Sequence, residues 1–150
     1  MDEIKVSENY STTQYIVIQL GDEKYGIDIK YVDNILKMQR ITRVPRVPKY
    51  LSGVINLRGE VVTVMDIRTK MDLPKMEETK NTRIIILKLE NVEKIGVIVD
   101  EVKEVVTLGA DEVEKNNQSA KEETAMFVSA VGKVGSELVS LLDLHAVVAE

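Results

Sequence analysis

Residues 60–67, EVVTVMDI, occur a second time seventy-seven positions later as residues 137–144, ELVSLLDL. The two stretches agree in size and polarity at each position, and both place Glu first, a hydroxyl residue fourth and Asp seventh. Apolar alternation predicts a strand before each Asp, and the residues after it favour a short helical turn. The repeat predicts that two halves of the chain share one β-rich layout.

A second pair of matching segments lies earlier in each half. Residues 25–29 (YGIDI) match residues 95–99 (IGVIV) at a spacing of seventy, and residues 32–36 match residues 102–106. Alternation alone could make two unrelated β-rich halves look alike, but the coinciding Glu, hydroxyl and Asp positions favour duplication. Each half holds enough strands for a small barrel, which buries its apolar face poorly alone, so the halves should pack on each other.

The predicted organisation is one folded region preceded by a tail. Residues 1–13 are polar and lack periodicity, so we expect a flexible tail. The first half is expected at about residues 14–73 and the second at about 82–147, and the halves can exchange terminal strands. Residues 116–124 are polar and are also expected to be mobile.

Local patterns place several elements. Hairpins are predicted over residues 15–29 and 126–142. Residues 31–36 have the i, i+3, i+4 apolar spacing that predicts a short helix. Residues 102–106 have the same spacing but are rich in valine, so a strand is an alternative prediction there. Residues 42–48 contain two prolines and predict an extended connector, with a PxxP ligand as the alternative.

Composition limits the class of function. The net charge is −5, with basic and acidic residues interspersed, so nucleic acid is not expected as a partner. There is no cysteine, which excludes disulfides, thiolate metal sites and thiol nucleophiles. Aromatic residues make up only 4% of the chain, so the core must be built from Val, Ile and Leu. The polar start does not resemble a signal peptide, and no apolar stretch reaches the length of a membrane span. We expect a cytoplasmic protein with no membrane insertion.

Duplication separates architectural residues from candidates for function. Asp66 and Asp143 occur in both halves, and each is expected to cap a short helix rather than to act as a catalytic carboxylate. Gly26 and Gly96 also recur, and they indicate a bulge or a close approach of neighbouring strands. Arg58 has no counterpart in the second half, so it is a candidate for binding a partner, with an ordinary solvated charge as the alternative.

The residues that catalysis or metal binding needs are not grouped in this sequence. His145 is the only histidine, and no Ser, Cys or carboxylate pattern can be tied to it by spacing. Phosphate-binding and dinucleotide-binding glycine patterns are missing as well. No catalytic residue, metal site or cofactor is expected, although a small carboxylate-dependent hydrolase remains an open alternative.

Three ordered motifs resemble the CheW family of chemotaxis coupling proteins. They are residues 53–68 (GVINLRGEVVTVMDIR), residues 26–29 (GIDI) and residues 96–102 (GVIVDEV). The resemblance covers about residues 14–147. It implies a mainly β fold of two SH3-like five-stranded β-barrel subdomains, pseudo-duplicated, packed on a shared core with short helices. It also implies a scaffold with no enzymatic activity that joins chemoreceptors to the histidine kinase CheA.

The resemblance further implies a receptor-binding groove between the subdomains, which takes the cytoplasmic tip of a methyl-accepting chemoreceptor. The positions that match it are Val32, Asn34, Ile35, Arg58, Val99, Val102 and Val105. Family members often carry an acidic residue where this chain has Asn34, which puts the role of a charge there in doubt. An apolar groove suits an amphipathic helix, and one arginine can fix its register.

The surfaces implied for the CheW-like regulatory domain of CheA are placed around Gly53 and Gly132. The resemblance also implies rings in which kinase and adaptor alternate, and in such rings other CheW copies are a further partner. It implies that the protein is recruited to membrane-associated receptor arrays. The alternative is a regulatory CheW-like module of a larger chemotaxis protein.

Overall fold

The computed structural model describes residues 11–115 and 126–149. The strands in this part are β1 (Thr12–Leu20), β2 (Glu23–Asp28), β3 (Val32–Lys37), β4 (Leu51–Leu57), β5 (Glu60–Asp66), β6 (Arg83–Leu87), β7 (Ile95–Val99), β8 (Glu101–Gly109), β9 (Val113–Lys115), β10 (Val128–Val134) and β11 (Glu137–Leu142). Short helices join or follow the strands, among them η1 (Ile29–Tyr31), α2 (Ile67–Lys70), η2 (Ala110–Glu112) and α3 (Leu144–Val148). The prediction of a mainly β fold is confirmed.

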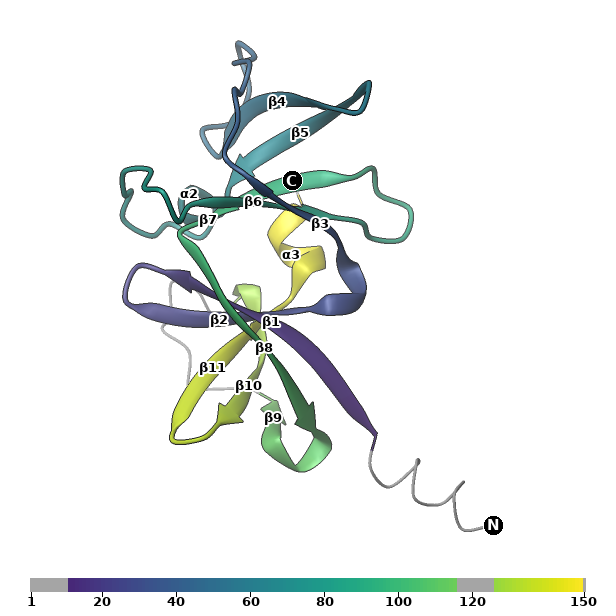
Figure 1. Cartoon of the computed structure of the whole chain (residues 1–150), viewed down its shortest axis with the longest axis vertical. Helices are drawn as coiled ribbons and strands as arrows, with labels where there is room; N and C mark the ends of the chain where they lie inside the picture. Colours follow the sequence, from purple (N-terminus) through teal and green to yellow (C-terminus); the bar gives the residue numbers. More distant parts are fainter. Residues whose placement is uncertain (1–10, 116–125, 150) are drawn as a thin grey trace.

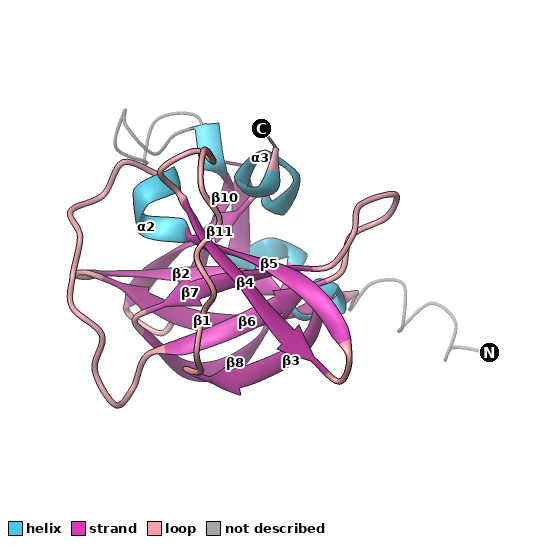
Figure 2. Cartoon of the chain, turned by 90° about the horizontal axis from the view of Figure 1, so that it is seen from above, coloured by secondary structure: helices cyan, strands magenta, loops and turns pink. Residues whose placement is uncertain are grey.

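The described strands form two sheets, which lie one above the other along the long axis of the molecule (Figure 1). Sheet A has the strand order β8-β1-β2-β11-β10-β9, and sheet B has the order β3-β6-β7-β5-β4. The equivalent strands of the repeat therefore hold equivalent places in the two sheets, with β9 as an additional edge strand of sheet A. Each sheet takes strands from both halves of the sequence, and the view from above shows the sheets overlapping (Figure 2).

One parallel strand pair in each sheet joins the two halves of the chain. Strand β2 pairs with β11, and β7 pairs with β5. A Cβ atom at Gly26 would lie 2.7 Å from Leu141 Cδ2, and one at Gly96 would lie 2.9 Å from Ile84 Cγ2. Both distances are shorter than ordinary contacts, so only glycine fits without displacing a neighbour. The predicted close approach at both glycines is confirmed.

The core has one shared part and two smaller ones. Side chains from both sheets, such as Ile18 of β1 and Ile85 of β6, pack in the shared cluster between the sheets. Ile84 and Ile86 of β6 point to the opposite face and pack in a separate cluster of sheet B. A strand buried on both faces has a continuous apolar sequence, and this is why β6 reads RIIIL.

The repeated aspartates begin the two helices at the junction of the sheets. Asp66 Oδ1 accepts a hydrogen bond of 3.0 Å from the Arg68 backbone N–H, and Asp143 Oδ1 accepts one of 3.2 Å from the Ala146 N–H. The capping prediction is confirmed for both residues. Helices α2 and α3 lie between the sheets (Figure 1), and each contributes apolar side chains to the shared core.

The predicted helix over residues 31–36 is wrong, because the structure has η1 followed by strand β3. Strand β3 pairs antiparallel with β6, which is about fifty residues away in sequence. Burial along β3 alternates from residue to residue, as a strand requires. The long-range pairing with a strongly apolar strand outweighs the local spacing. The second stretch of this spacing lies in β8, so the strand alternative holds there.

Strand β1 begins at Thr12, so the tail ends earlier than predicted. Thr12 and Thr13 pair with Gly109 and Leu108 of β8. The remainder of the predicted tail, residues 1–10, and the stretch 116–124 lie outside the described residues. The predicted hairpin at the end of the chain is formed by β10 and β11. Among the described helices, none has the length and apolar character needed to cross a bilayer.

Candidate partner-binding surfaces

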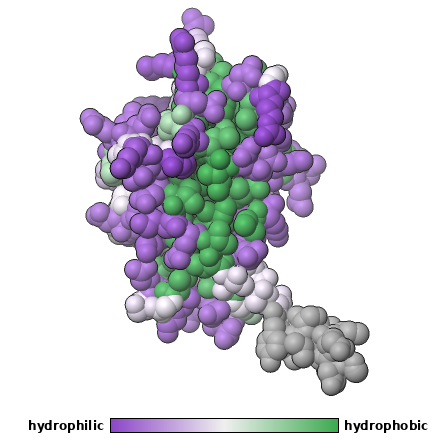
Figure 3. Space-filling model, in the orientation of Figure 1, coloured by the Kyte–Doolittle hydropathy of each residue, from purple (hydrophilic) through white to green (hydrophobic). Residues whose placement is uncertain are grey.

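Strands β3 and β8 expose equivalent apolar residues at the edges of the two sheets. Ile35 of β3 is 40% exposed and Val105 of β8, seventy positions later, is 50% exposed. Val32 and Val102, the other equivalent pair, are partly buried against the shared core. An apolar band runs down the middle of the face that carries β8, with hydrophilic side chains on both sides (Figure 3). Exposed apolar residues bordered by polar ones are typical of protein-binding sites.

Arg58 lies at the tip of the β4–β5 hairpin and is exposed. Its backbone has a φ of 55°, and Gly59 follows with a φ of 85°. The Gly59 N–H donates a 2.8 Å hydrogen bond to Asn56 Oδ1, which closes the turn. In the described residues, no ion pair or hydrogen bond holds the Arg58 guanidinium. The equivalent position in the β10–β11 hairpin is Gly135, with a φ of 61°.

Residues next to the Arg58 turn and residues of strand β3 share one small core. Leu57, the sequence neighbour of Arg58, and Leu36, the neighbour of Ile35, pack against the same small cluster of sheet B. The β4–β5 hairpin and the Leu36 side of β3 therefore border one small core, whereas Ile35 points to the opposite face of sheet B, the face of Ile85. Asn34 lies on β3, half-buried, and its Oδ1 accepts a 3.0 Å hydrogen bond from the Ile35 N–H.

Three predicted site residues are buried. Val99 is 0% exposed in the shared core, so its side chain cannot line an open groove in this structure. Gly53 and Gly132 are also buried. A Cβ atom at Gly53 would lie 2.1 Å from the Thr42 carbonyl oxygen, and one at Gly132 would lie 2.6 Å from Leu108 Cδ1. The two glycines serve close packing of the chain, and any partner must touch their neighbours.

Exposed apolar residues do occur on the strands next to those glycines. Val61 of β5 is 69% exposed, and Leu138 of β11 is 66% exposed. The two residues are equivalent in the repeat, at the spacing of seventy-seven. Each lies on the strand that pairs with the glycine-bearing strand of its own sheet. The duplicated fold therefore presents a matching apolar residue on each sheet.

A buried ion pair at the junction of the sheets was missed by the sequence reasoning. Arg68 of α2 is 5% exposed, and its Nη1 lies 2.7 Å from Asp100 Oδ2. The same carboxylate oxygen accepts a 2.8 Å hydrogen bond from the Gly21 N–H in the β1–β2 turn. Arg68 Nε donates to the Pro74 carbonyl at 2.7 Å. Arg68 aligns with His145 in the other half, so the comparison of halves could have found it.

The described residues contain no group of three or more possible metal ligands. A pocket beside the β3–β4 segment is lined by one carboxylate, Asp66, whose Oδ1 is already used to cap α2. In the described residues, the candidates for function are therefore exposed surfaces and not a polar cleft.

A duplicated β fold with matching apolar residues on its two edge strands defines a scaffold that acts by binding other proteins. The chain belongs to the CheW family, since residues 14–150 match the model of the CheW-like domain. It is therefore a chemotaxis adaptor without enzymatic activity, and the hydrolase alternative is set aside.

Individual relatives agree with this assignment. The chain is 37% identical over 145 residues to the chemotaxis protein CheW of Bacillus subtilis, covering 97% of this chain and 89% of that protein. It is 30% identical to the chemotaxis protein CheW of Klebsiella aerogenes, covering 88% and 79%. The crystal structure of the scaffolding protein TtCheW from Thermoanaerobacter tengcongensis superposes with a TM-score of 0.83 at 30% identity, covering 90% and 91%.

Proposed function

We propose that this adaptor couples the cytoplasmic tips of methyl-accepting chemoreceptors to the histidine kinase CheA in the cytoplasm, within membrane-associated receptor arrays. The observation that carries the proposal is the equivalent exposure of Ile35 and Val105 on the edge strands of the two sheets. Chemoreceptor tips are helical, and an amphipathic helix binds through a stripe of apolar side chains. Val32 and Val102 would form the floor of the groove, and Arg58 would bind a polar group at its border.

CheA is proposed to bind elsewhere, at the sheet surfaces next to Gly53 and Gly132. Val61 and Leu138 supply the exposed apolar side chains there. Two equivalent surfaces allow one adaptor to contact two neighbouring CheW-like domains. Such a scaffold can be built into a ring, and the neighbours can be kinase domains or other copies of this chain.

The test is the assembly of a ternary complex from the full chain, CheA and a receptor signalling fragment, followed by sedimentation. The wild-type chain is expected to bind both partners, and failure to bind either one would refute the proposed coupling.

Point variants then separate the two surfaces. Ile35→Glu and Val105→Glu are expected to weaken receptor binding by about tenfold or more, because each buries a charge against apolar surface. Leu138→Glu is the matched control for receptor binding, because Leu138 is 66% exposed on β11 and belongs to the proposed CheA surface. The groove assignment fails if all three variants bind the receptor fragment equally.

A further inference from the structure

The segment between β3 and β4 has an unusual charge pattern. Basic residues occur at every third position from the end of β3, namely Lys37, Arg40, Arg43, Arg46 and Lys49. Residues 37–50, which we call the basic loop, contain no Asp or Glu. The whole chain has a net charge of −5, so this local concentration of positive charge stands out from the rest of the surface.

The part of the basic loop from residue 42 to residue 50 is held at both ends. Thr42 and Val54 of β4 exchange two backbone hydrogen bonds, of 2.8 and 2.9 Å. At the other end the Leu51 N–H donates to the Pro48 carbonyl at 3.0 Å, and the Asp66 N–H donates to the Tyr50 carbonyl at 2.7 Å. Two prolines further restrict the backbone between these anchors. The cations are therefore displayed on a pre-organised loop, which lowers the entropy cost of binding.

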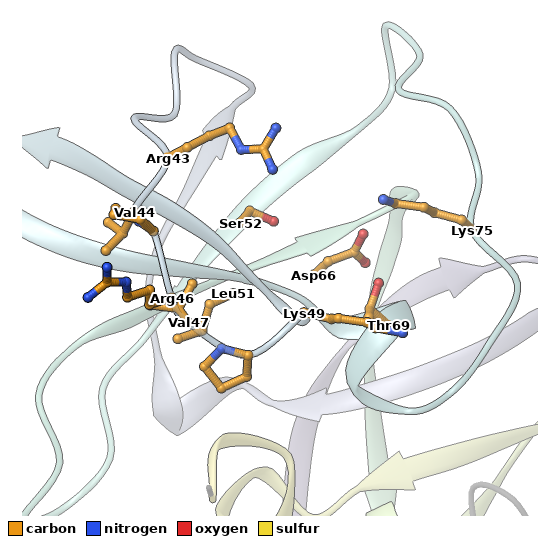
Figure 4. Close-up of a pocket in the computed structure, with 12 residues that line it drawn as sticks. Arg43, Val44, Arg46, Val47, Lys49, Leu51, Ser52, Asp66, Thr69 and Lys75 are labelled. Atoms are coloured by element: carbon orange, nitrogen blue, oxygen red, sulfur yellow. The ribbon is translucent and has the colours of Figure 1, made fainter.

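Beside the loop is an open pocket of about 770 Å³, lined by Arg43, Arg46, Lys49 and Lys75 among others. Figure 4 shows Arg43 and Lys75 extending toward each other across the pocket, with Asp66 between them, while Arg46 points away to the outer side of the loop. In the described part of the chain, none of these four cations has an ion pair or a side-chain hydrogen bond. Their charges are available to a ligand.

Arg46 occupies a backbone conformation that disfavours it. It follows Pro45 in a turn and has a φ of 63°, the left-handed region that glycine and asparagine occupy most readily in such turns. A non-glycine residue held there costs free energy, and residues of this kind concentrate at functional sites. Arg46 therefore carries its guanidinium at a turn position that glycine would occupy with less backbone strain.

The arrangement of the cations indicates the kind of ligand. They are spread along the loop and around the pocket, a distribution that suits several anionic groups along an extended ligand better than one phosphate group. Val44, Val47 and the prolines separate them, and Tyr50, the loop's aromatic residue, is already covered by the Lys70 ammonium at 4.2 Å from its ring. Stacking of nucleic acid bases therefore lacks an aromatic platform.

We propose that the basic loop is a docking site for an extended acidic segment of a partner protein, in which carboxylates alternate with apolar residues. The carboxylates pair with the arginines and lysines, and the apolar residues contact the valines and prolines. This site does not depend on the proposed receptor groove, and it lies beside the proposed CheA surface, since Ile41 and Thr42 of the loop pack on Gly53. The PxxP alternative is disfavoured, since the φ of Arg46 departs from polyproline II geometry.

The test is fluorescence anisotropy with the full chain and a labelled peptide of alternating glutamate and valine residues. Binding is expected at low salt and is expected to weaken as salt rises. Arg43→Gln, Arg46→Gly and Lys75→Gln should each weaken binding by up to about fivefold, the range of exposed ion pairs. Lys133→Gln on β10 is the matched control, because it removes one exposed charge from sheet A.

Each other outcome overturns the proposal. The peptide could fail to bind at low salt, or Lys133→Gln could weaken it as much as the loop variants, which would indicate a non-specific charge effect. Competition by inorganic tripolyphosphate or by a single-stranded RNA as effectively as by unlabelled peptide would assign the loop to a different ligand class. Arg46→Gly keeps the test valid if other variants fold poorly, because its backbone suits glycine.

Discussion

Replacing Arg58 by glycine should stabilise the fold and weaken receptor binding at the same time. The residue holds a φ of 55°, and the equivalent turn of the other half has Gly135 with a φ of 61°. The duplicated fold thus shows that glycine is the residue this turn accepts without strain. The Asn56 side chain would still accept the hydrogen bond from the Gly59 N–H.

The size of the effect follows from two opposing contributions. A left-handed backbone costs an L-residue about 1–2 kcal/mol, and this cost is removed in Arg58→Gly. Glycine makes the unfolded chain more flexible, which returns about 0.4–1 kcal/mol. The difference between these contributions is about 0–1.6 kcal/mol, centred near 0.8 kcal/mol. A gain of about 0.8 kcal/mol in the free energy of unfolding raises the melting temperature of a chain of this size by roughly 2–3 °C.

Calorimetry and receptor-fragment sedimentation on the same samples check both expectations. The reciprocal variant Gly135→Arg is the control: it should lose about 0.8 kcal/mol and leave receptor binding unchanged. Nothing lies within 4 Å of a Cβ atom built at Gly135, so backbone strain alone would act there. A lower melting temperature for Arg58→Gly would show that the guanidinium makes stabilising contacts. Unchanged receptor binding would remove Arg58 from the proposed groove.

Three further predictions concern the scaffold. Asp100→Asn should lower the free energy of unfolding by about 2–4 kcal/mol in urea titrations, because it leaves the buried Arg68 guanidinium without its anion; the exposed Asp22→Asn should change it little, and equal losses would argue against the ion pair. Burial, followed by the nearby Glu23 carboxylate, raises the pKa of Tyr25, so the unfolded chain ionises first and stability should fall above about pH 10; this alkaline loss should be smaller in Tyr25→Phe. Gly53→Ala should lower the free energy of unfolding by at least about 1–3 kcal/mol, because its Cβ atom would overlap the Thr42 carbonyl. An unchanged melting temperature would show that Gly53 has room for a side chain and so belongs to the surface.

Features set by neighbours in sequence were predictable. Asp66 and Asp143 cap helices that begin one residue later, and the β10–β11 hairpin joins adjacent strands. Strand β3 was not predictable in this way, because its apolar spacing suits a helix and its partner β6 lies far along the chain. The assignment of strands to sheets was equally inaccessible, since the parallel pairing of β5 with β7 depends on tertiary packing.

The candidate site residues were also predictable from the sequence only in part. Matching residues by family motif located the edge positions Ile35 and Val105, which the structure exposes. It could not foresee that Val99 is wholly buried, because alternation does not state which face of a strand meets the second sheet. Arg68 was not singled out, although it aligns with His145 and so differs between the halves in the same way as Arg58. Its burial beside Asp100, by contrast, is seen only in the structure.

The asymmetry between the halves gives the proposed groove a direction. Ile35 and Val105 are equivalent, so their apolar contacts alone would accept a helix in either of two orientations related by the pseudo-symmetry of the fold. Arg58 exists on one side only, where the other half has Gly135. Charged groups contribute more to specificity and register than to affinity. Apolar variants at Ile35 or Val105 should therefore reduce affinity more than Arg58→Gly, while loss of Arg58 should let the bound helix adopt the reversed orientation, which spin labels at the two ends of the receptor fragment would detect.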